Sequence, residues 1–298
     1  MPATCFALIA IGLWASLASL GVLLSHVPPF LLTGVALLIG SIWAWPAVWR
    51  DPTAWRVSRR VLALGVVTLF GFHFFLFLGL RMASSVEVNL VNYLWPLLIV
   101  VMAPWYLERS HTHLWQLVAA ALGFIGAAIA IRGAQGAPGG EWVSGLPQAV
   151  GWKNTLGYFL ALVSACLWAN YSLQTRRLAD AGQAFPTSAI GLFCLVSGIL
   201  SLVCHAAMEP TPVLTGSDMG LLLLMGLGPL GAAFYAWDKA LKTGDARVIG
   251  ILSYLTPLLS TALLMVVTHR SFNGSIGLAA LLIIGAAILG AATTPSRR

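Results

Sequence analysis

Charged residues are scarce in this chain. Asp, Glu, Lys and Arg make up 8% of its 298 residues, while 59% are hydrophobic and the mean hydropathy is +0.90. A soluble domain usually carries about 25% charged residues. With so few charges a water-facing surface of ordinary composition could not be covered, so the composition excludes a single soluble domain and indicates an integral membrane protein.

Reactive motifs are also missing. The four cysteines lie within or beside apolar segments and form no C-x-x-C pair, so we predict inert thiols with no disulfide or metal role. The chain has no G-x-x-x-x-G-K-[ST] phosphate loop, no H-E-x-x-H, no G-x-S-x-G and no carboxylate cluster for Mg²⁺. We therefore expect no cofactor, no ATP-driven transport and no enzymatic activity, with an intramembrane enzyme kept as a remote alternative.

Apolar runs between polar breaks predict ten membrane spans. We expect the first run to be a membrane span and not a signal peptide, because no Lys or Arg precedes Arg50 and further apolar runs follow at once. Small residues over 123–127 and 285–290 predict close packing of the fifth and tenth spans. The predicted spans are 3–24, 29–48, 61–80, 84–107, 114–131, 156–174, 187–205, 219–241, 247–267 and 276–292.

Basic residues fall mainly on one side of this path. Twelve of the sixteen Lys and Arg lie on the side of the two termini, and the other four are Arg81, Arg132, Lys153 and Arg270. Cytoplasmic loops carry the excess of Lys and Arg, so we expect both termini in the cytoplasm of a multi-pass inner-membrane protein. Topology also explains the net charge of +7. The bilayer is then the expected partner, with no nucleic acid and no obligate protein partner.

The sequence repeats across its centre. Residues 92–98 (Asn-Tyr-Leu-Trp-Pro-Leu-Leu) match residues 253–259 (Ser-Tyr-Leu-Thr-Pro-Leu-Leu), and Leu-Trp-Ala occurs at 13–15 and again at 167–169. We predict one five-helix repeat over 1–135, a periplasmic connector over 136–155 and a second five-helix repeat over 156–298. Because five is odd, the two halves cross the membrane in opposite directions, an arrangement used by alternating-access transporters.

These features resemble the drug/metabolite transporter superfamily, EamA type. The resemblance rests on the ten spans in two inverted halves, the repeated Leu-Trp-Ala, and a Leu-Arg or Leu-Lys pair about a dozen residues before x-Tyr-Leu-x-Pro. The aromatic run 72–77 and the segment 87–96 are most similar to YddG-type exporters of aromatic amino acids. The resemblance implies export of small amphipathic metabolites without nucleotide hydrolysis. Thr256 stands where the first half has Trp95, so the halves would not share a site equally.

Polar and aromatic stripes at helical spacing predict the lining of a central cavity. An amide or ionisable side chain at bilayer depth normally faces the bundle interior or a water-filled cavity. Taken singly, each such residue also fits a hydrogen bond or packing contact between helices. The predicted substrate-binding residues are His73, Phe74, Phe77, Asn89, Asn92, Tyr93, Trp95, Trp168, Asn170, Tyr171, Tyr235, Ser253 and Tyr254.

Some roles stay open on the residues alone. His73 fits a structural histidine, a substrate partner or a proton carrier, so the driving force is undecided. Trp14 fits either packing or lipid contact. Asp238 and Lys242, four residues apart, are expected to pair.

Glu87 and Arg81 could pair across an outer gate. Efflux of cationic drugs or quaternary ammonium compounds is the nearest alternative function, although a cavity without a mid-span acid disfavours it. A passive channel would need a longer and less aromatic polar pore.

Overall fold

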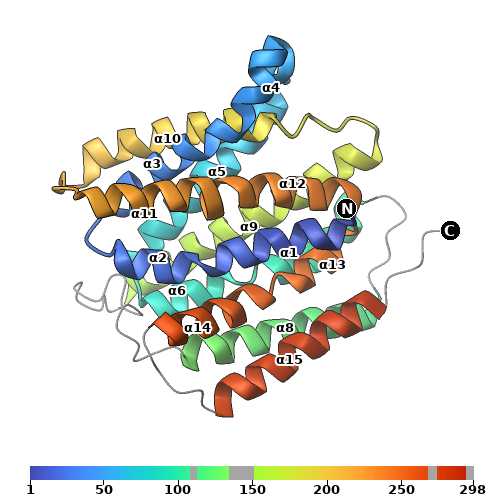
Figure 1. Cartoon of the computed structure of the whole chain (residues 1–298). Coiled ribbons are helices and arrows are strands. Elements are labelled where there is room, and N and C mark those ends of the chain that lie inside the picture. Colours follow the sequence, from blue (N-terminus) through green and yellow to red (C-terminus); the bar gives the residue numbers. More distant parts are fainter. Residues whose placement is uncertain (108–112, 134–150, 268–273, 293–298) are drawn as a thin grey trace.

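The computed structural model describes residues 1–107, 113–133, 151–267 and 274–292, and every regular element in these ranges is helical (Figure 1). Three short irregular helices are the 3₁₀ segments Ile42–Ala44 and Pro52–Trp55 and the π-helical segment Gly228–Ala232. The α-helices are α1 (Ala3–Ala15), α2 (Leu17–Leu23), α3 (Pro29–Ser41), α4 (Trp45–Arg50), α5 (Arg59–Leu80), α6 (Ser85–Asn92), α7 (Trp95–Tyr106), α8 (Leu114–Gly133), α9 (Trp152–Asp180), α10 (Ala189–Met208), α11 (Gly216–Leu227), α12 (Ala233–Thr243), α13 (Ala246–Leu252), α14 (Leu255–Val267) and α15 (Gly274–Ala292).

Ten of the helical segments are long and apolar enough to cross a membrane, which confirms the prediction of an all-helical, ten-span membrane protein. Each observed span overlaps one predicted span. The largest difference is the sixth span, which runs over Trp152–Asp180 where the sequence predicted 156–174. The predicted connector 136–155 lies mostly outside the described residues, and its last four residues belong to α9.

Two spans break beside a proline. The fourth span is interrupted at Tyr93 and Leu94, just before Pro96, and the ninth is interrupted at Ser253 and Tyr254, just before Pro257. Proline lacks the backbone N–H and its ring clashes with the carbonyl four residues earlier, so a continuous helix is disfavoured at both places. The side chains after each break therefore do not continue the helical register of the side chains before it.

The eighth span bends through the π-helical segment between α11 and α12. Two carbonyl oxygens there accept hydrogen bonds from indole N–H groups: Trp14 donates to Pro229 at 3.1 Å, and Trp43 donates to Leu227 at 2.9 Å. Backbone polar groups at membrane depth need such partners because no water is available in the hydrocarbon core. These bonds tie the first and second spans to the eighth.

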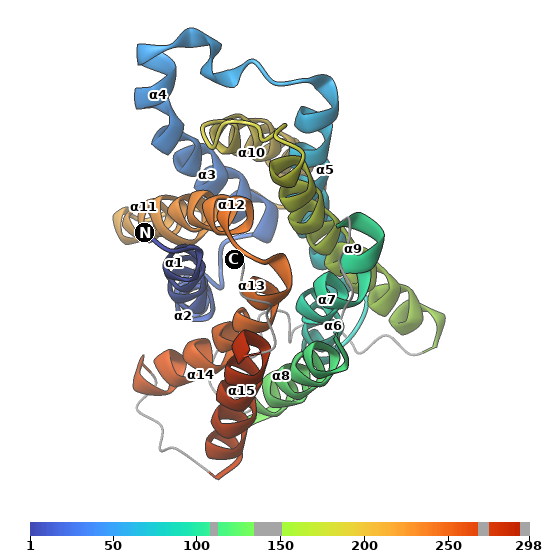
Figure 2. The same cartoon turned by 90° about the vertical axis from the view of Figure 1, so that its right-hand side faces the viewer.

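Helices of one half pack mainly against helices of the other half. The closest packing pairs are α8 with α15, α3 with α10, α5 with α9, and α1 with α12 (Figure 2). A Cβ atom added at Gly126 in α8 would lie 2.7 Å from the Ile283 side chain of α15, so the expected close contact of the fifth and tenth spans is confirmed. α1 begins and α15 ends on the same side of the bundle (Figure 1).

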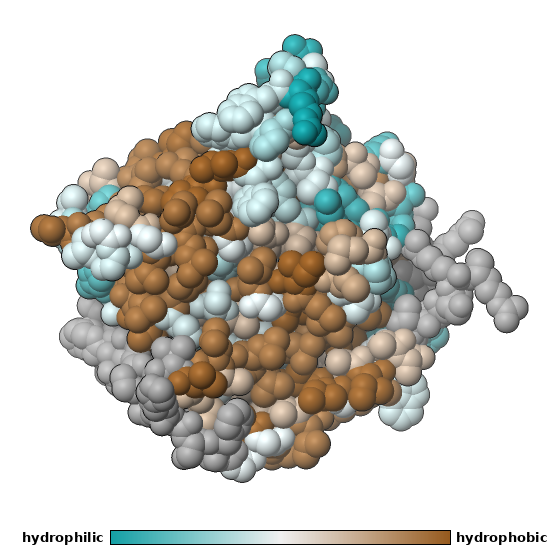
Figure 3. Space-filling view, in the orientation of Figure 1, coloured by the Kyte–Doolittle hydropathy of each residue, from teal (hydrophilic) through white to brown (hydrophobic). Residues whose placement is uncertain are grey.

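The surface of the bundle is broadly hydrophobic. Brown residues cover most of the face in Figure 3, and teal residues gather on the projecting α4 and its surroundings. Large apolar side chains on α11 and α15 are exposed, among them Met219, Leu223, Leu224, Leu281, Ile284 and Ile288. Such a surface would be unfavourable in water and is suited to lipid, so the chain is a multi-pass membrane protein.

Candidate functional site: a two-walled cavity between the halves

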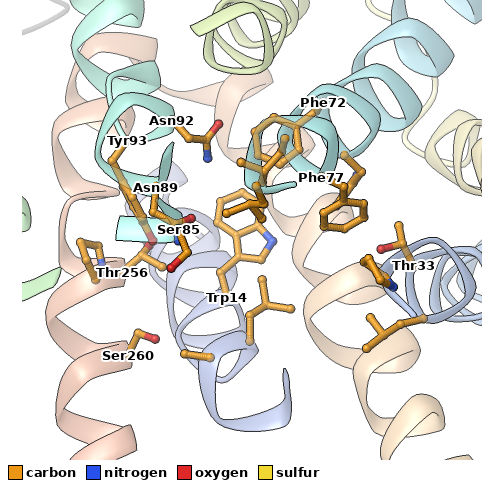
Figure 4. A pocket seen from close by; sticks show the side chains of 18 of the residues that line it. Trp14, Thr33, Phe72, Phe77, Ser85, Asn89, Asn92, Tyr93, Thr256 and Ser260 are labelled. Atoms are coloured by element: carbon orange, nitrogen blue, oxygen red, sulfur yellow. The ribbon is translucent and has the colours of Figure 1, made fainter. Parts of the chain in front are cut away.

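A cavity of about 560 Å³ lies between the two halves, a volume within the usual range for small-molecule sites. It extends from the middle of the bundle to Ser25, in the connection between the first two spans, and to Ser85, the first residue of α6, on the side away from the termini. Figure 4 shows its two walls. Polar side chains of the fourth and ninth spans, among them Asn89 and Thr256, face aromatic side chains such as Phe77.

Tryptophans form the inner end of the cavity. Trp14, Trp95 and Trp168 line it from the first, fourth and sixth spans, and each is less than 9% exposed. The ring centroid of Trp14 lies 5.7 Å from that of Trp168 and 5.1 Å from that of Trp237, which is fully buried behind them. Phe72 adds a contact to Trp168 at 5.4 Å. Tilted and edge-to-face contacts of this kind hold aromatic rings in fixed orientations.

The polar wall offers groups without full hydrogen bonding. Thr256 and Ser260 lie one turn apart on α14, and both line the cavity. The buried Thr256 hydroxyl has no hydrogen-bond partner among the described residues. Asn92 is held in place, because the Ser164 hydroxyl lies 3.2 Å from its Oδ1. An unpartnered hydroxyl at a cavity wall favours a polar ligand group or water beside it.

His73 lines the cavity from α5 and is 9% exposed. Its Nδ1 lies 2.7 Å from the backbone carbonyl oxygen of Leu69. A carbonyl can only accept a hydrogen bond, so Nδ1 carries the hydrogen. In the neutral ring Nε2 is then an acceptor, suited to a ligand N–H group.

The structure places seven of the sequence-predicted site residues on the cavity wall. These are His73, Phe77, Asn89, Asn92, Tyr93, Trp95 and Trp168. They come from the third, fourth and sixth spans, so the structure brings together residues that the sequence separates by up to 95 positions.

The other six predicted residues lie outside the cavity lining. Asn170 accepts a hydrogen bond from the Tyr106 hydroxyl at 2.8 Å, and the Tyr235 hydroxyl donates to the Gly40 carbonyl oxygen at 3.2 Å. Ser253 donates to the Gly250 carbonyl oxygen at 2.5 Å within its own helix turn. The remaining three pack against other side chains: Phe74 against Phe30, Tyr171 against Trp168, and Tyr254 in a buried cluster with Ala127 and Ile283.

Sequence reasoning missed part of the polar wall and left Trp14 undecided. Thr256 and Ser260 stand four residues apart in an apolar run, a spacing that places them on one face. The sequence prediction instead took Ser253 and Tyr254 as the lining residues of this span. The break at Ser253 and Tyr254 turns Thr256, and not Ser253, toward the cavity.

Charged residues at the cavity mouth pair differently from the expected outer gate. Arg81 lines the mouth, and its Nη2 lies 3.0 Å from Oε1 of Glu209. Glu87 accepts a hydrogen bond from the Tyr158 hydroxyl. The suggested pairing of Arg81 with Glu87 is therefore wrong, because a carboxylate from the other half of the chain occupies the guanidinium.

A polar network fills the bundle on the side of the termini. Lys242 donates to Asp238 at 2.6 Å, as the sequence predicted, and to the Phe185 carbonyl oxygen at 2.7 Å. Thr187 donates to the same Asp238 carboxylate at 2.7 Å. Arg176 of α9 donates to the Lys242 carbonyl oxygen at 3.1 Å. These contacts join the sixth and eighth spans where the cavity is closed.

The connection between the eighth and ninth spans carries one more ion pair. Arg247 donates to both carboxylate oxygens of Asp245, at 3.0 and 2.7 Å. Burial acts to raise the pKa of Asp245, but the hydrogen bonds and charge of Arg247 outweigh it, so the pKa of this carboxyl lies below its ordinary value. Among the described residues, no group of three or more His, Cys, Asp or Glu could hold a metal ion.

Comparison with known proteins establishes the family to which the chain belongs. The EamA-like transporter family matches residues 1–132 and 155–291. The chain is an EamA-like transporter. A solved crystal structure superposes on this transporter with a TM-score of 0.86 at 34% identity, covering 99% of this chain and 98% of that one.

Three curated relatives of the transporter are aromatic amino acid exporters named YddG. The one from Ancylobacter novellus is 36% identical over 299 residues, covering 99% of the transporter and 98% of the relative. The one from Escherichia coli K12 is 28% identical over 96% of both chains. The one from Salmonella typhimurium is 29% identical over 88% of the transporter and 87% of the relative. The resemblance noted from the sequence is thus confirmed at the level of the family.

Proposed function

We propose that this transporter exports aromatic and other bulky neutral amino acids across the bacterial inner membrane by alternating access. The observation that carries the proposal is the cavity with one aromatic and one polar wall (Figure 4). The three curated relatives, which match 88–99% of this chain, are named as aromatic amino acid exporters, and this supports the same substrate class.

The two walls suit the two ends of an aromatic amino acid. Its ring would lie against Trp14, Phe72 or Phe77, where edge-to-face contacts are available. Its polar end would face Asn89 and Thr256, whose oxygen atoms accept hydrogen bonds from an ammonium group. The wall that the structure builds thus matches a zwitterion with an apolar side chain better than a uniformly polar metabolite.

Helix packing supports the inverted repeat of the two halves. If span 1 corresponds to span 6 and so on, then the packing of α5 on α9, spans 3 and 6, corresponds to the packing of α1 on α12, spans 1 and 8. The pairs α3 with α10 and α8 with α15 each join corresponding spans. The fourth and ninth spans break at nearly corresponding positions. An odd number of spans in each half would then give the halves opposite directions.

The distribution of Lys and Arg supports cytoplasmic termini. With that orientation the cavity opens toward the periplasm, and the network of Arg176, Asp238 and Lys242 closes the cytoplasmic side. Export would require this network to open and the mouth near Arg81 to close, by rocking of the halves 1–135 and 156–298 about the cavity. The 136–155 connector would lie on the periplasmic side.

Efflux of cationic drugs is the second candidate within the family. No carboxylate lines the cavity among the described residues, whereas a desolvated cation favours one. The aromatic wall alone could still hold a quaternary ammonium ion by cation–π contact. The observed charge balance of the wall therefore favours amino acids.

Flux measurements on purified protein in liposomes test the proposal. We expect saturable uptake of radiolabelled phenylalanine and tryptophan, competed by each other and weakly by alanine. A parallel series with and without a pH gradient would decide whether a proton drives transport, with His73 as the mid-span candidate. Absence of flux for both amino acids, with methyl viologen transported, would replace the proposal by cation efflux.

A further inference from the structure

Arg81 is the one Lys or Arg side chain that lines the cavity, and no Asp or Glu lines it, within the described part of the chain. It directly follows α5, and 31% of its side chain is exposed. Its guanidinium carbon lies 5.5 Å from the centroid of the Phe30 ring. Phe77, one helical turn earlier on the cavity wall, packs edge-on against that ring at 5.5 Å. A cation therefore stands beside an aromatic surface at the mouth.

The partner of Arg81 is a carboxylate that is already well satisfied. Glu209 is 1% exposed and accepts hydrogen bonds from the backbone N–H groups of Phe30 and Leu31 at 3.1 and 3.2 Å. It also lies 3.0 Å from Nδ1 of His205. The positive end of α3 adds a partial charge of about half a unit beside the carboxylate. The negative charge of Glu209 is thus shared among several donors and cancels only part of the charge on Arg81.

Arg81 has hydrogen-bonding capacity left over. Only its Nη2 contacts Glu209, and its Nε and Nη1 have no hydrogen-bond partner among the described residues. The side chain lies on the cavity wall and is partly exposed there. A guanidinium with unoccupied N–H groups in a mostly apolar cavity is a strong site for an anion, because charge-assisted hydrogen bonds to carboxylates are short and directional.

We propose that Arg81 binds the carboxylate of the transported amino acid in the outer part of the cavity, with Glu209 as the residue that positions it. The ring of the substrate would lie toward Phe77, and its ammonium group toward Asn89 and Ser85 on the opposite wall (Figure 4). The transporter then selects aromatic compounds that carry a carboxylate over aromatic amines without one. This inference rests on the proposed transport of amino acids.

Binding of three related compounds to the purified full-length transporter tests the role of Arg81. Quenching of intrinsic tryptophan fluorescence would report binding of phenylalanine, of 3-phenylpropionate, which lacks the amine, and of phenethylamine, which lacks the carboxylate. In Arg81→Gln we expect the affinity for the first two to fall roughly ten- to hundredfold and the affinity for the cationic phenethylamine not to fall. Arg59→Gln is the matched control, since Arg59 is exposed at the far end of the same helix.

A double variant separates binding from structural support. Arg81→Gln leaves Glu209 with one partner fewer, so Arg81→Gln combined with Glu209→Gln removes both charges together. We expect the double variant to remain folded and still to lack the preference for 3-phenylpropionate over phenethylamine. Recovery of that preference in the double variant, or unchanged affinities in Arg81→Gln, would overturn the inference.

The proposed function can fail separately. If the wild-type protein moves no aromatic amino acid but binds 3-phenylpropionate through Arg81, the substrate claim is wrong and the anion site remains.

Discussion

Phe77 offers a clean test of the aromatic wall. Its side chain lines the cavity from α5 and is only half-buried, so its removal leaves no closed void in the core. Opposite it lie the polar groups Asn89 and Ser85 (Figure 4). In Phe77→Ala the substrate ring would lose one flank of its aromatic surroundings, while the contacts of Trp14 and Trp168 with each other would persist.

The size of the effect follows from these contacts. A favourable aromatic pair contributes about 0.5–1.5 kcal/mol beyond the area it buries. With part of the burial of a phenylalanine side chain added, the loss comes to about 1–2 kcal/mol. That corresponds to a roughly 5- to 30-fold increase in the apparent KM for phenylalanine. Phe77→Leu retains an apolar side chain and part of the volume but loses the ring, so we expect a smaller increase of roughly two- to tenfold.

Initial rates of phenylalanine and leucine uptake into proteoliposomes provide the assay. Phe77→Ala should lower the preference for phenylalanine over leucine, because leucine has no aromatic ring to pack against that of Phe77. Phe159→Ala is the matched control, because Phe159 is 58% exposed on the outer surface of α9. An unchanged preference in Phe77→Ala, or an equal change in Phe159→Ala, would show that the cavity wall is not where the ring binds.

Three further predictions concern stability and gating. Gly65→Ala should lower the thermal stability of the purified protein and its yield, because a Cβ there would lie 2.3 Å from the Phe193 ring; Gly220→Ala, with open space around it, should not. Arg176→Gln should speed amide hydrogen exchange in the last turn of α12, whose carbonyl at Lys242 it contacts, and leave exchange in α15 unchanged. Because the pKa of Asp245 is lowered on folding, its pair with Arg247 stabilises the protein above the unfolded pKa near 3.8, and this stability is lost as the pH falls through the lower folded pKa. Asp245→Asn should therefore reduce the fall of the melting temperature with decreasing pH in this acidic range. An unchanged dependence of the melting temperature on pH would contradict this.

The membrane spans were the most predictable part of the structure. A span needs about 20 apolar residues whatever it packs against, so composition alone locates it. The start of α9 was less predictable, because Trp152 and Lys153 are compatible with a loop but belong to the helix in the structure. The breaks beside Pro96 and Pro257 had a local signal in proline, whereas the break at Ser16 has no proline; there the Ser16 hydroxyl donates to the Leu13 carbonyl oxygen at 2.7 Å, a local bond that competes with the helical backbone.

The cavity lining was predicted well in the fourth span and poorly in the ninth. Asn89 and Asn92 lie before the break in the fourth span and Tyr93 lies at it, so helical spacing still placed all three on one face. At the corresponding break in the ninth span, the same reasoning selected Ser253 and missed Thr256, which lies beyond the break and lines the cavity. Long-range partners carry no local signal at all: the contact of Arg81 with Glu209 joins residues 128 positions apart.

A cysteine-labelling experiment tests most directly whether aromatic amino acids pass through this cavity. Ser260 lines the cavity, and none of the four native cysteines does. In Ser260→Cys a bulky methanethiosulfonate reagent should abolish phenylalanine flux, and excess phenylalanine should slow the reaction. Ser217→Cys, exposed outside the cavity on the same side, should keep its flux after labelling. Full flux through labelled Ser260→Cys would contradict the proposed path.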